Sequence, residues 1–326
     1  MRRINYREAL KEALTEEMDR DKRVIIIGED IGVYGGSFKV TLGLLEKYGP
    51  QRIIDTPISE NSLIGVAVGA AVHGMRPVAE ISFIDFITLA MDQIVNGAAK
   101  IPAFSGELFK TPLVIRTQGG IGRGIGGQHE QSLEAWFVHT PGLKVVMPST
   151  PYDAKGLLKT SIRDEGAVVF IENKKLYPLE GDIPEEEYLI PLGKADIKRE
   201  GIDLTVIATS YMVHESLKAA EILEGEGISI EIVDPRTLVP FDYDTVLDSV
   251  KKTGKVMITH EAVKRGGIGA EISAIIAEEA FDYLKAPIYR LAAPNIVIPY
   301  NYSLDEYCIP SVNDIVLKVR EILGKK

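Results

Sequence analysis

The chain has 326 residues, of which 45% are hydrophobic and 26% charged, a balance typical of a folded protein of about two domains. The net charge of −10, without a polybasic run, argues against a nucleic-acid partner, and the longest apolar stretch is well short of the ~20 residues that cross a membrane. A single cysteine, Cys308, excludes an internal disulfide. Together with the charged Met1-Arg2-Arg3 start, it predicts a cytoplasmic protein with no membrane partner.

The first half of the chain alternates between helical and strand-like patterns. Apolar residues at three- and four-residue spacing from Tyr6 to Met18 predict a helix that Asn5 caps. Strand-like runs follow at 24–27, 78–81, 113–116, 143–147 and 167–171, with helical patterns at 61–73, 86–100 and 151–163. This alternation predicts an α/β domain with a doubly wound, mostly parallel sheet.

The pattern lapses near residue 178, where prolines and an acidic run predict a linker over 178–193. The predicted domains are therefore 1–177 and 194–326. The second also reads as α/β, with strands at 204–208, 228–233, 255–259 and 288–291 and helices at 213–224, 243–252 and 268–281.

Two carboxylates occupy positions where open α/β sheets bind ligands. Glu29 follows the first strand, and it is either part of a solvated acidic turn or a site residue. Glu60 precedes a helix of small residues over 63–73, and it either satisfies first-turn amides or works at a site. Small residues let another backbone approach closely, so this helix indicates an interface, and a carboxylate there is a candidate for proton transfer.

Aromatic residues lie at the end of a strand. Phe83 and Phe86 follow the run 78–81 beside Ser82. Their rings either pack in the core or sandwich a flat heterocycle.

Six glycines occupy the nine positions 119–127, which predicts a loop that stays mobile until something binds. His129 at its exit is a candidate to donate or accept a proton, whereas we interpret His139 as structural. A second glycine turn at 266–269 lacks full dinucleotide spacing. We interpret it as a tight strand-to-helix turn; the alternative is a nicotinamide-dependent oxidoreductase.

Several long motifs resemble those of one family. They include Asp55–Glu60, Gly74–Glu80, Pro141–Val146 and Asp234–Pro240. These segments are similar to the beta subunit of the thiamine-diphosphate-dependent component of 2-oxo acid dehydrogenases, and the resemblance runs from end to end. It implies a transketolase-like pyrimidine-binding domain followed by a transketolase C-terminal-like α/β domain.

The resemblance also implies roles for single residues. Glu60 would hydrogen-bond the aminopyrimidine of thiamine diphosphate and promote removal of the thiazolium proton, with Glu29 assisting. His129 would meet the 2-oxo acid and the lipoyl group. The residues implied to line the pyrimidine are Ile58, Ser59, Ser82, Phe83 and Phe86. Ser82 stands where some relatives have a longer amide.

Metal sites and partners follow from the same resemblance. In some relatives, carbonyl groups bind potassium at the positions of Leu113, Ser161, Ile162, Asp164 and Gly166, although Gly166 replaces a residue with a side chain in others. The family's Gly-Asp-Gly motif with a downstream Asn, which binds Mg²⁺ and the diphosphate, is missing from this chain. An alpha subunit would therefore hold both.

The implied assembly is an α2β2 heterotetramer docked to a lipoyl acyltransferase core. It would oxidatively decarboxylate pyruvate or a branched-chain 2-oxo acid and transfer the acyl group to lipoyl-lysine. The alternatives are an acetoin dehydrogenase beta subunit and a non-catalytic scaffold for the alpha subunit.

Overall fold

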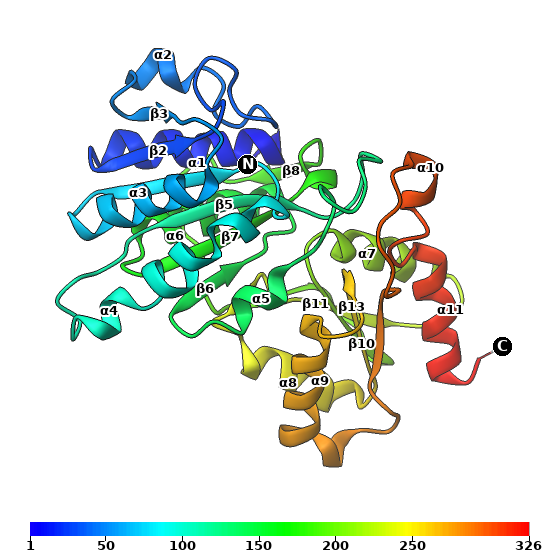
Figure 1. Cartoon of the computed structure of the whole chain (residues 1–326). Helices are drawn as coiled ribbons and strands as arrows, with labels where there is room; N and C mark the ends of the chain where they lie inside the picture. Colours follow the sequence, from blue (N-terminus) through cyan, green and yellow to red (C-terminus); the bar gives the residue numbers. More distant parts are fainter. Residues whose placement is uncertain (326) are drawn as a thin grey trace. The chain divides into compact units, whose positions relative to one another are not determined.

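The computed structural model describes residues 1–325, which form two compact units (Figure 1). The first unit contains residues 1–119 and 136–192, and the second contains residues 120–135 and the chain from 193 onward. The segment that carries the glycine-rich loop thus belongs to the second unit, although the chain on either side of it belongs to the first. Each unit is α/β, which confirms the predicted fold class.

The first unit is built on parallel strands in the order β6-β7-β5-β4-β2-β3. Most of their residues are buried, as expected of a parallel sheet covered on both faces. Because the strands are parallel, the residues that follow them gather at one edge. The strands are β2 (Val24–Gly28), β3 (Ile53–Asp55), β4 (Arg76–Ile81), β5 (Val114–Gly119), β6 (Leu143–Val146) and β7 (Ala167–Asn173).

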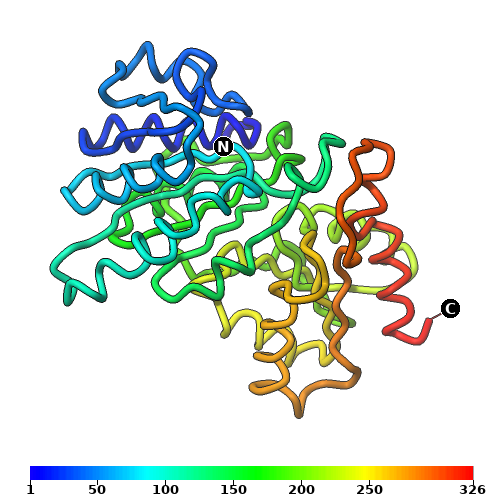
Figure 2. The backbone as a smooth tube through the Cα atoms, viewed as in Figure 1, coloured from blue at the N-terminus to red at the C-terminus, as the bar shows by residue number. Residues whose placement is uncertain are grey.

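Two of the helices flanking this sheet begin at side-chain caps, of which Asn5 was predicted. Asn5 and Glu8 form a capping box on α1, and Thr150 accepts a hydrogen bond from the backbone N–H of Asp153 at the start of α6. The two helices pack against each other, and β1 (Arg2–Asn5) pairs antiparallel with β8 (Glu180–Ile183), which brings the chain back to its N-terminus (Figure 2). The helices are α1 (Tyr6–Arg20), α2 (Leu44–Tyr48), α3 (Glu60–Val72), α4 (Ile101–Phe104), α5 (Glu134–Val138), α6 (Pro151–Arg163) and the 3₁₀ turn η3 (Lys174–Leu176).

One prediction was wrong in this unit. The single helix expected over 86–100 is a 3₁₀ turn, η1 (Phe86–Ala90), followed by a π-helical turn, η2 (Gln93–Ala98). Gln93 packs against α3, where a β-carbon on Gly65 would lie 3.4 Å from the Gln93 Oε1 atom. Close packing on a small-residue helix, with the poor helix former Gly97 in the last turn, favours these short irregular turns.

The second unit has a sheet in the order β14-β13-β10-β11-β9, with β9 antiparallel to its neighbour. Helix α11, which was not predicted, packs on α7 through Ile315 and Val319. No helix within residues 1–325 has both the length and the apolar character that crossing a membrane requires. The elements are β9 (Asp196–Arg199), β10 (Leu204–Ala208), α7 (Tyr211–Glu224), β11 (Ile230–Asp234), β12 (Thr237–Val239), α8 (Tyr243–Thr253), β13 (Val256–Val263), α9 (Ile268–Glu279), η4 (Phe281–Tyr283), β14 (Tyr289–Ala293), α10 (Tyr302–Asp305) and α11 (Val312–Leu323).

Candidate functional site

Two predicted carboxylates lie together at the carboxyl edge of the first unit's sheet. Glu29 directly follows β2, and Glu60 is the first residue of α3. Both side chains are half-buried. Burial raises the pKa of Glu29, and the charges of Asp30 and Glu60 raise it further. Two interacting carboxylates in a partly desolvated place favour a state in which one of them holds a proton.

The residues before α3 are not used as a helix cap. Ser59 is the N-cap residue, but its side chain accepts no hydrogen bond from the helix, and its Oγ donates to the Oγ of Ser62 at 2.9 Å. Ile58 is 74% exposed. Ser59 therefore does not cap α3 through its side chain, and the apolar side chain of Ile58, two residues before Glu60, lies open to a ligand.

The aromatic pair is half-buried at the end of β4. The rings of Phe83 and Phe86 meet edge to face with centroids 5.8 Å apart, and Phe83 makes a second edge contact with Phe38, also at 5.8 Å. Ser82 accepts a hydrogen bond from Ser37 at 3.1 Å. The rings are thus neither enclosed in the core nor fully exposed, so apolar surface remains for a flat ring.

A buried ion cluster, which was not predicted, joins the strands β4, β5 and β7. Arg116 donates through Nη1 to Glu80 at 2.6 Å, and through Nε and Nη2 to the two oxygens of Glu172 at 2.6 and 2.9 Å. None of the three side chains is more than 2% exposed. Burial opposes the charge on Arg116, but Glu172 and Glu80 outweigh it and raise the pKa of the guanidinium. Mutual pairing compensates for the desolvation of these charges.

Tyr177 connects this cluster to the aromatic pair. Its hydroxyl donates to Glu172 at 2.5 Å, and its ring stacks on Phe38 with centroids 4.8 Å apart. Phe38 in turn contacts Phe83. The aromatic side of the site therefore rests on buried groups that the ion cluster holds by a hydrogen bond.

His129 belongs to the second unit, at the exit of the glycine-rich loop. Its side chain is half-buried, and its backbone N–H donates to the carbonyl of Gly126 at 3.0 Å. The next residue, Glu130, is fully buried and accepts hydrogen bonds from the loop's backbone N–H groups. The loop was expected to need a ligand for its order, but it contains an internal acceptor of its own.

The second glycine turn, at the start of α9, has a packing function. Gly267 and Gly269 lie against the buried ring of His260 too closely for a side chain at either position. The turn joins β13 to α9, which confirms the interpretation as a tight strand-to-helix turn.

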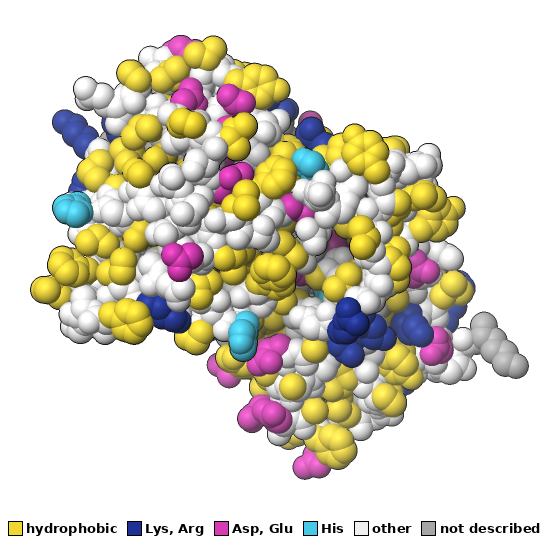
Figure 3. Space-filling view, viewed as in Figure 1, with side chains coloured by type: hydrophobic (Ala, Val, Ile, Leu, Met, Phe, Trp, Pro, Cys, Tyr) yellow, Lys and Arg dark blue, Asp and Glu magenta, His cyan; other side chains and the backbone are white. Residues whose placement is uncertain are grey.

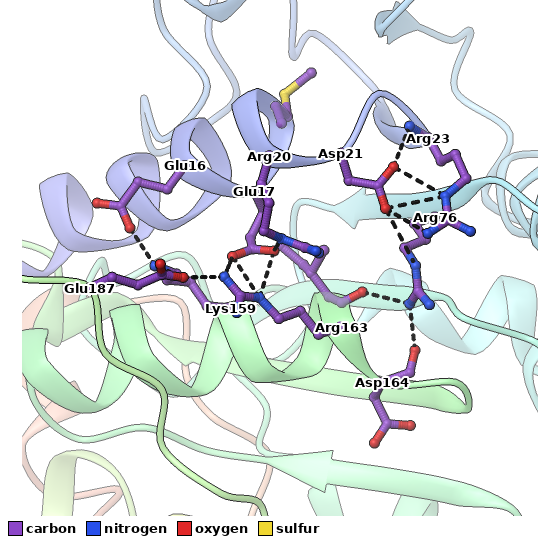
Figure 4. A network of polar contacts seen from close by, with 12 residues as sticks. Glu16, Glu17, Arg20, Asp21, Arg23, Arg76, Lys159, Arg163, Asp164 and Glu187 are labelled. Atoms are coloured by element: carbon purple, nitrogen blue, oxygen red, sulfur yellow. Dashed lines mark hydrogen bonds and ion pairs between the residues drawn. The ribbon is translucent and has the colours of Figure 1, made fainter.

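The positions expected to bind potassium lie in the first unit, next to a cation that the chain itself supplies. The Nη1 group of Arg76 donates to the carbonyl oxygens of Ile162 and Asp164 at 3.0 and 2.9 Å (Figure 4). The carbonyls of Leu113 and Ser161 accept backbone N–H groups. Each carbonyl keeps a second lone pair, so a potassium ion here would share oxygens with a guanidinium. Within residues 1–325, no three His, Cys, Asp or Glu side chains are grouped to hold a metal.

Two family models cover most of the chain. Residues 2–180 match the transketolase pyrimidine-binding domain, and residues 193–315 match the transketolase C-terminal domain. A solved structure titled "Split gene transketolase, inactive beta4 tetramer" shares the fold, with a TM-score of 0.80 and 24% identity over 99% of each chain.

Curated relatives match nearly the whole chain. The 2-oxoisovalerate dehydrogenase subunit beta of Bacillus subtilis is 47% identical and the alignment covers 98% of each chain. The pyruvate dehydrogenase E1 component subunit beta of Porphyra purpurea is 47% identical, covering 99% of this chain and 98% of its own. The acetoin:2,6-dichlorophenolindophenol oxidoreductase subunit beta of Cupriavidus necator is 46% identical with the same coverage. The chain therefore belongs to the family of 2-oxo acid dehydrogenase E1 beta subunits, with the transketolase fold that its motifs predict.

Proposed function

We propose that this chain supplies the pyrimidine side of a thiamine diphosphate site in an enzyme that oxidatively decarboxylates a short 2-oxo acid. The acyl group would pass to lipoyl-lysine on a partner enzyme. The observation that carries the proposal is the pair of interacting carboxylates, Glu29 and Glu60, at the carboxyl edge of the sheet. The family to which the chain belongs depends on thiamine diphosphate.

The residues at this edge fit an aminopyrimidine. Ile58 and the rings of Phe83 and Phe86 offer partly open apolar surface for a flat heterocycle. Glu60 would share a proton with a weakly basic ring nitrogen, and the raised pKa of Glu29 limits the repulsion between the two carboxylates. Bound thiamine diphosphate supplies the carbon nucleophile and the electron sink that loss of carbon dioxide requires.

His129 would act on the substrate side. Its half-buried imidazole carries ring nitrogens that can donate or accept a hydrogen bond. We assign it to stabilising the substrate-derived intermediate and assisting the transfer to the lipoyl group.

An alpha subunit would complete the site, because the chain lacks the Gly-Asp-Gly motif for Mg²⁺ and diphosphate. The exposed part of α3 offers a surface for it. Val66 is 60% exposed, and a β-carbon on Gly69 would meet no atom within 4 Å. Hydrophobic side chains gather on the visible face over α3 and α4 (Figure 3). Leu89 on η1 and Phe104 on α4 are 62% and 82% exposed. An apolar surface of this kind is typical of a partner contact.

The assembly that we propose is an α2β2 heterotetramer bound to a lipoyl acyltransferase core in the cytoplasm. Potassium, where it binds, would use the second lone pairs of the carbonyls around Arg76. Thermal midpoints in potassium chloride and in tetramethylammonium chloride test this directly, and equal midpoints would count against a potassium site.

We propose a class of substrate, short 2-oxo acids, and not a single compound. Relatives that act on 2-oxoisovalerate, pyruvate and acetoin differ by one percentage point in identity to this chain. Acetoin is therefore the second candidate. A panel of pyruvate, 2-oxoisovalerate and acetoin, given to the assembled enzyme, separates the three.

Calorimetric titration of thiamine diphosphate with Mg²⁺ tests the shared site. We expect tight binding to the chain mixed with an alpha subunit and none to the chain alone. Tight binding to the chain alone would mean that it holds the diphosphate itself. No binding in a mixture shown to be assembled would favour the scaffold alternative.

The variant Glu60→Gln tests the role of the carboxylate. We expect normal assembly and a fall in turnover of about 10²–10⁴-fold, the range that general acid–base groups contribute. Full activity in an assembled Glu60→Gln enzyme would support the scaffold alternative. The exposed Glu107→Gln on the same unit serves as a control and should keep its activity.

A further inference from the structure

The glycine-rich loop is organised around a single carboxylate. Glu130 is fully buried, and its oxygens accept four backbone N–H groups of the loop. Its Oε1 accepts from Gly122, Arg123 and Gly124 at 3.0, 2.7 and 3.1 Å, and its Oε2 accepts from Gly126 at 3.2 Å. Four backbone amides of the loop are thus bound by one side chain.

The glycines make this convergence possible. Gly122, Gly124 and Gly126 have φ values of 129°, 66° and 76°, a region that residues with a side chain rarely adopt. When such residues alternate with ordinary ones, successive N–H groups point to a common centre and form an anion-binding concavity. Here the anion is the side chain of Glu130, so this concavity is filled from within the chain and is not open to a phosphate.

The surroundings explain why the loop needs this anchor. On one side it rests on the segment 297–305 (Figure 2): the Gly124 N–H also donates to Asp305 at 2.9 Å, and a β-carbon on Gly124 would lie 2.5 Å from the backbone nitrogen of Tyr302. On another side lies a cavity of about 210 Å³, which Glu130 helps to line. A loop beside a cavity has few packing contacts there, so hydrogen bonds must hold its shape.

We propose that Glu130 is a positioning residue, whose carboxylate fixes the loop over 120–128 and so holds the adjacent His129 in place before substrate arrives. The statement about His129 rests on the function proposed above; the statement about the loop does not. Hydrogen bonds to a charged acceptor are roughly twice as strong as neutral ones, so the charge of Glu130 matters as well as its size.

Limited trypsin digestion of the full chain tests the loop directly. Trypsin cuts after arginine, and Arg123 is exposed. The peptide bond that it would cut contains the nitrogen of Gly124, and the N–H of Gly124 donates hydrogen bonds to Glu130 and Asp305. Glu130→Gln keeps the shape of the side chain but replaces one carboxylate oxygen with an NH₂ group. That group is itself a donor, so it cannot accept hydrogen bonds from the backbone N–H groups of the loop. We expect cleavage after Arg123 about tenfold faster in this variant, the effect of losing one charged hydrogen bond.

A matched control removes a different buried carboxylate of the same unit. Glu231 is fully buried and contacts Ser249 and Lys252, not the loop. Glu231→Gln should leave cleavage after Arg123 unchanged. Unchanged cleavage in Glu130→Gln, or equal acceleration in both variants, would overturn the proposal. If Glu130→Gln does not fold, Asp305→Asn takes its place and should accelerate the same cut by a smaller factor.

The assembled enzyme tests the positioning of His129. With Mg²⁺, thiamine diphosphate, a free lipoyl domain and the preferred 2-oxo acid, Glu130→Gln should lower kcat for lipoyl acylation about tenfold and leave the KM for the 2-oxo acid unchanged. Glu130→Asp, which keeps the charge, should recover part of the loss. Faster cleavage with an unchanged kcat would overturn the positioning role. Full activity in His129→Ala would instead refute the function proposed for His129 and leave the loop result standing.

Discussion

Gly267 and His260 approach so closely that a β-carbon on residue 267 would lie 2.6 Å from the imidazole Cε1. His260 is fully buried, and its Nδ1 lies 3.0 Å from the carbonyl oxygen of Ala262. Burial, reinforced by the charge of Arg290, lowers the pKa of His260 to about 4, so the ring is neutral at pH 7. The glycine is therefore required by a buried aromatic ring.

Gly267→Ala should destabilise the second unit. The added methyl would also lie 2.6 Å from the carbonyl oxygen of Val263, so either the ring or the backbone must move. Overpacking of this kind typically costs about 1–3 kcal/mol. We expect a lower urea midpoint, measured by circular dichroism. A midpoint equal to that of the parent chain would show that the turn accommodates the methyl group without strain.

Arg116→Gln should destabilise the first unit. The variant leaves Glu80 and Glu172 buried without their cation, and breaking a buried ion pair costs about 3–5 kcal/mol. Trp136, the only tryptophan, belongs to the same unit, so its fluorescence reports the unfolding. The surface variant Lys110→Gln, which removes an exposed ion pair with Glu107, should change the free energy of unfolding by less than about 1 kcal/mol. Equal effects of the two variants would contradict this account.

The helices and strands with strong periodic patterns could be predicted from the sequence. The continuous apolar run of β2 and the capping box of α1 carry their signals locally. The irregular turns over 86–98 could not be predicted, because they depend on packing against α3, whose position is a tertiary property. Helix α11 was overlooked even though Ser311 and Asp314 form a capping box at its start.

Site residues at strand ends could be located because a parallel sheet gathers them at one edge, as it does Glu29 and Glu60. The partners of Arg116 lie 36 and 56 residues away, so no local spacing reveals the cluster. An arginine within an apolar strand was the available signal, since such a charge needs buried carboxylates. For Glu130, the corresponding signal was an acidic residue three positions after the last glycine of a run whose amides need an acceptor.

Glu134 should make stability fall as the pH rises. Its side chain is 1% exposed, and burial raises its pKa from 4.5 to about 7. Between these values the folded state holds a proton that the unfolded state has lost, so stability decreases from about pH 4.5 to about pH 7, by about 3 kcal/mol in all. Glu134→Gln should remove this loss and be the more stable protein at pH 8. Urea midpoints of the parent chain and of Glu134→Gln, measured at pH 5 and at pH 8, test this prediction. If the midpoints of the two proteins differ by the same amount at both pH values, Glu134 is not the group responsible.

Gly69→Ala should have opposite effects on the isolated chain and on the assembly. In the chain alone the new methyl meets no atom within 4 Å, and alanine is favoured over glycine in a helix interior by roughly 1 kcal/mol, so the thermal midpoint should rise. In the assembly, the proposed close contact of α3 with the alpha subunit leaves no room for the methyl, so the dissociation constant should increase about tenfold or more, the effect of about 1.4 kcal/mol. Sedimentation of the mixed subunits measures the second effect, with the exposed Glu221→Ala on α7 as control. A variant that is more stable and still associates with unchanged affinity would place the alpha contact elsewhere than on this face of α3.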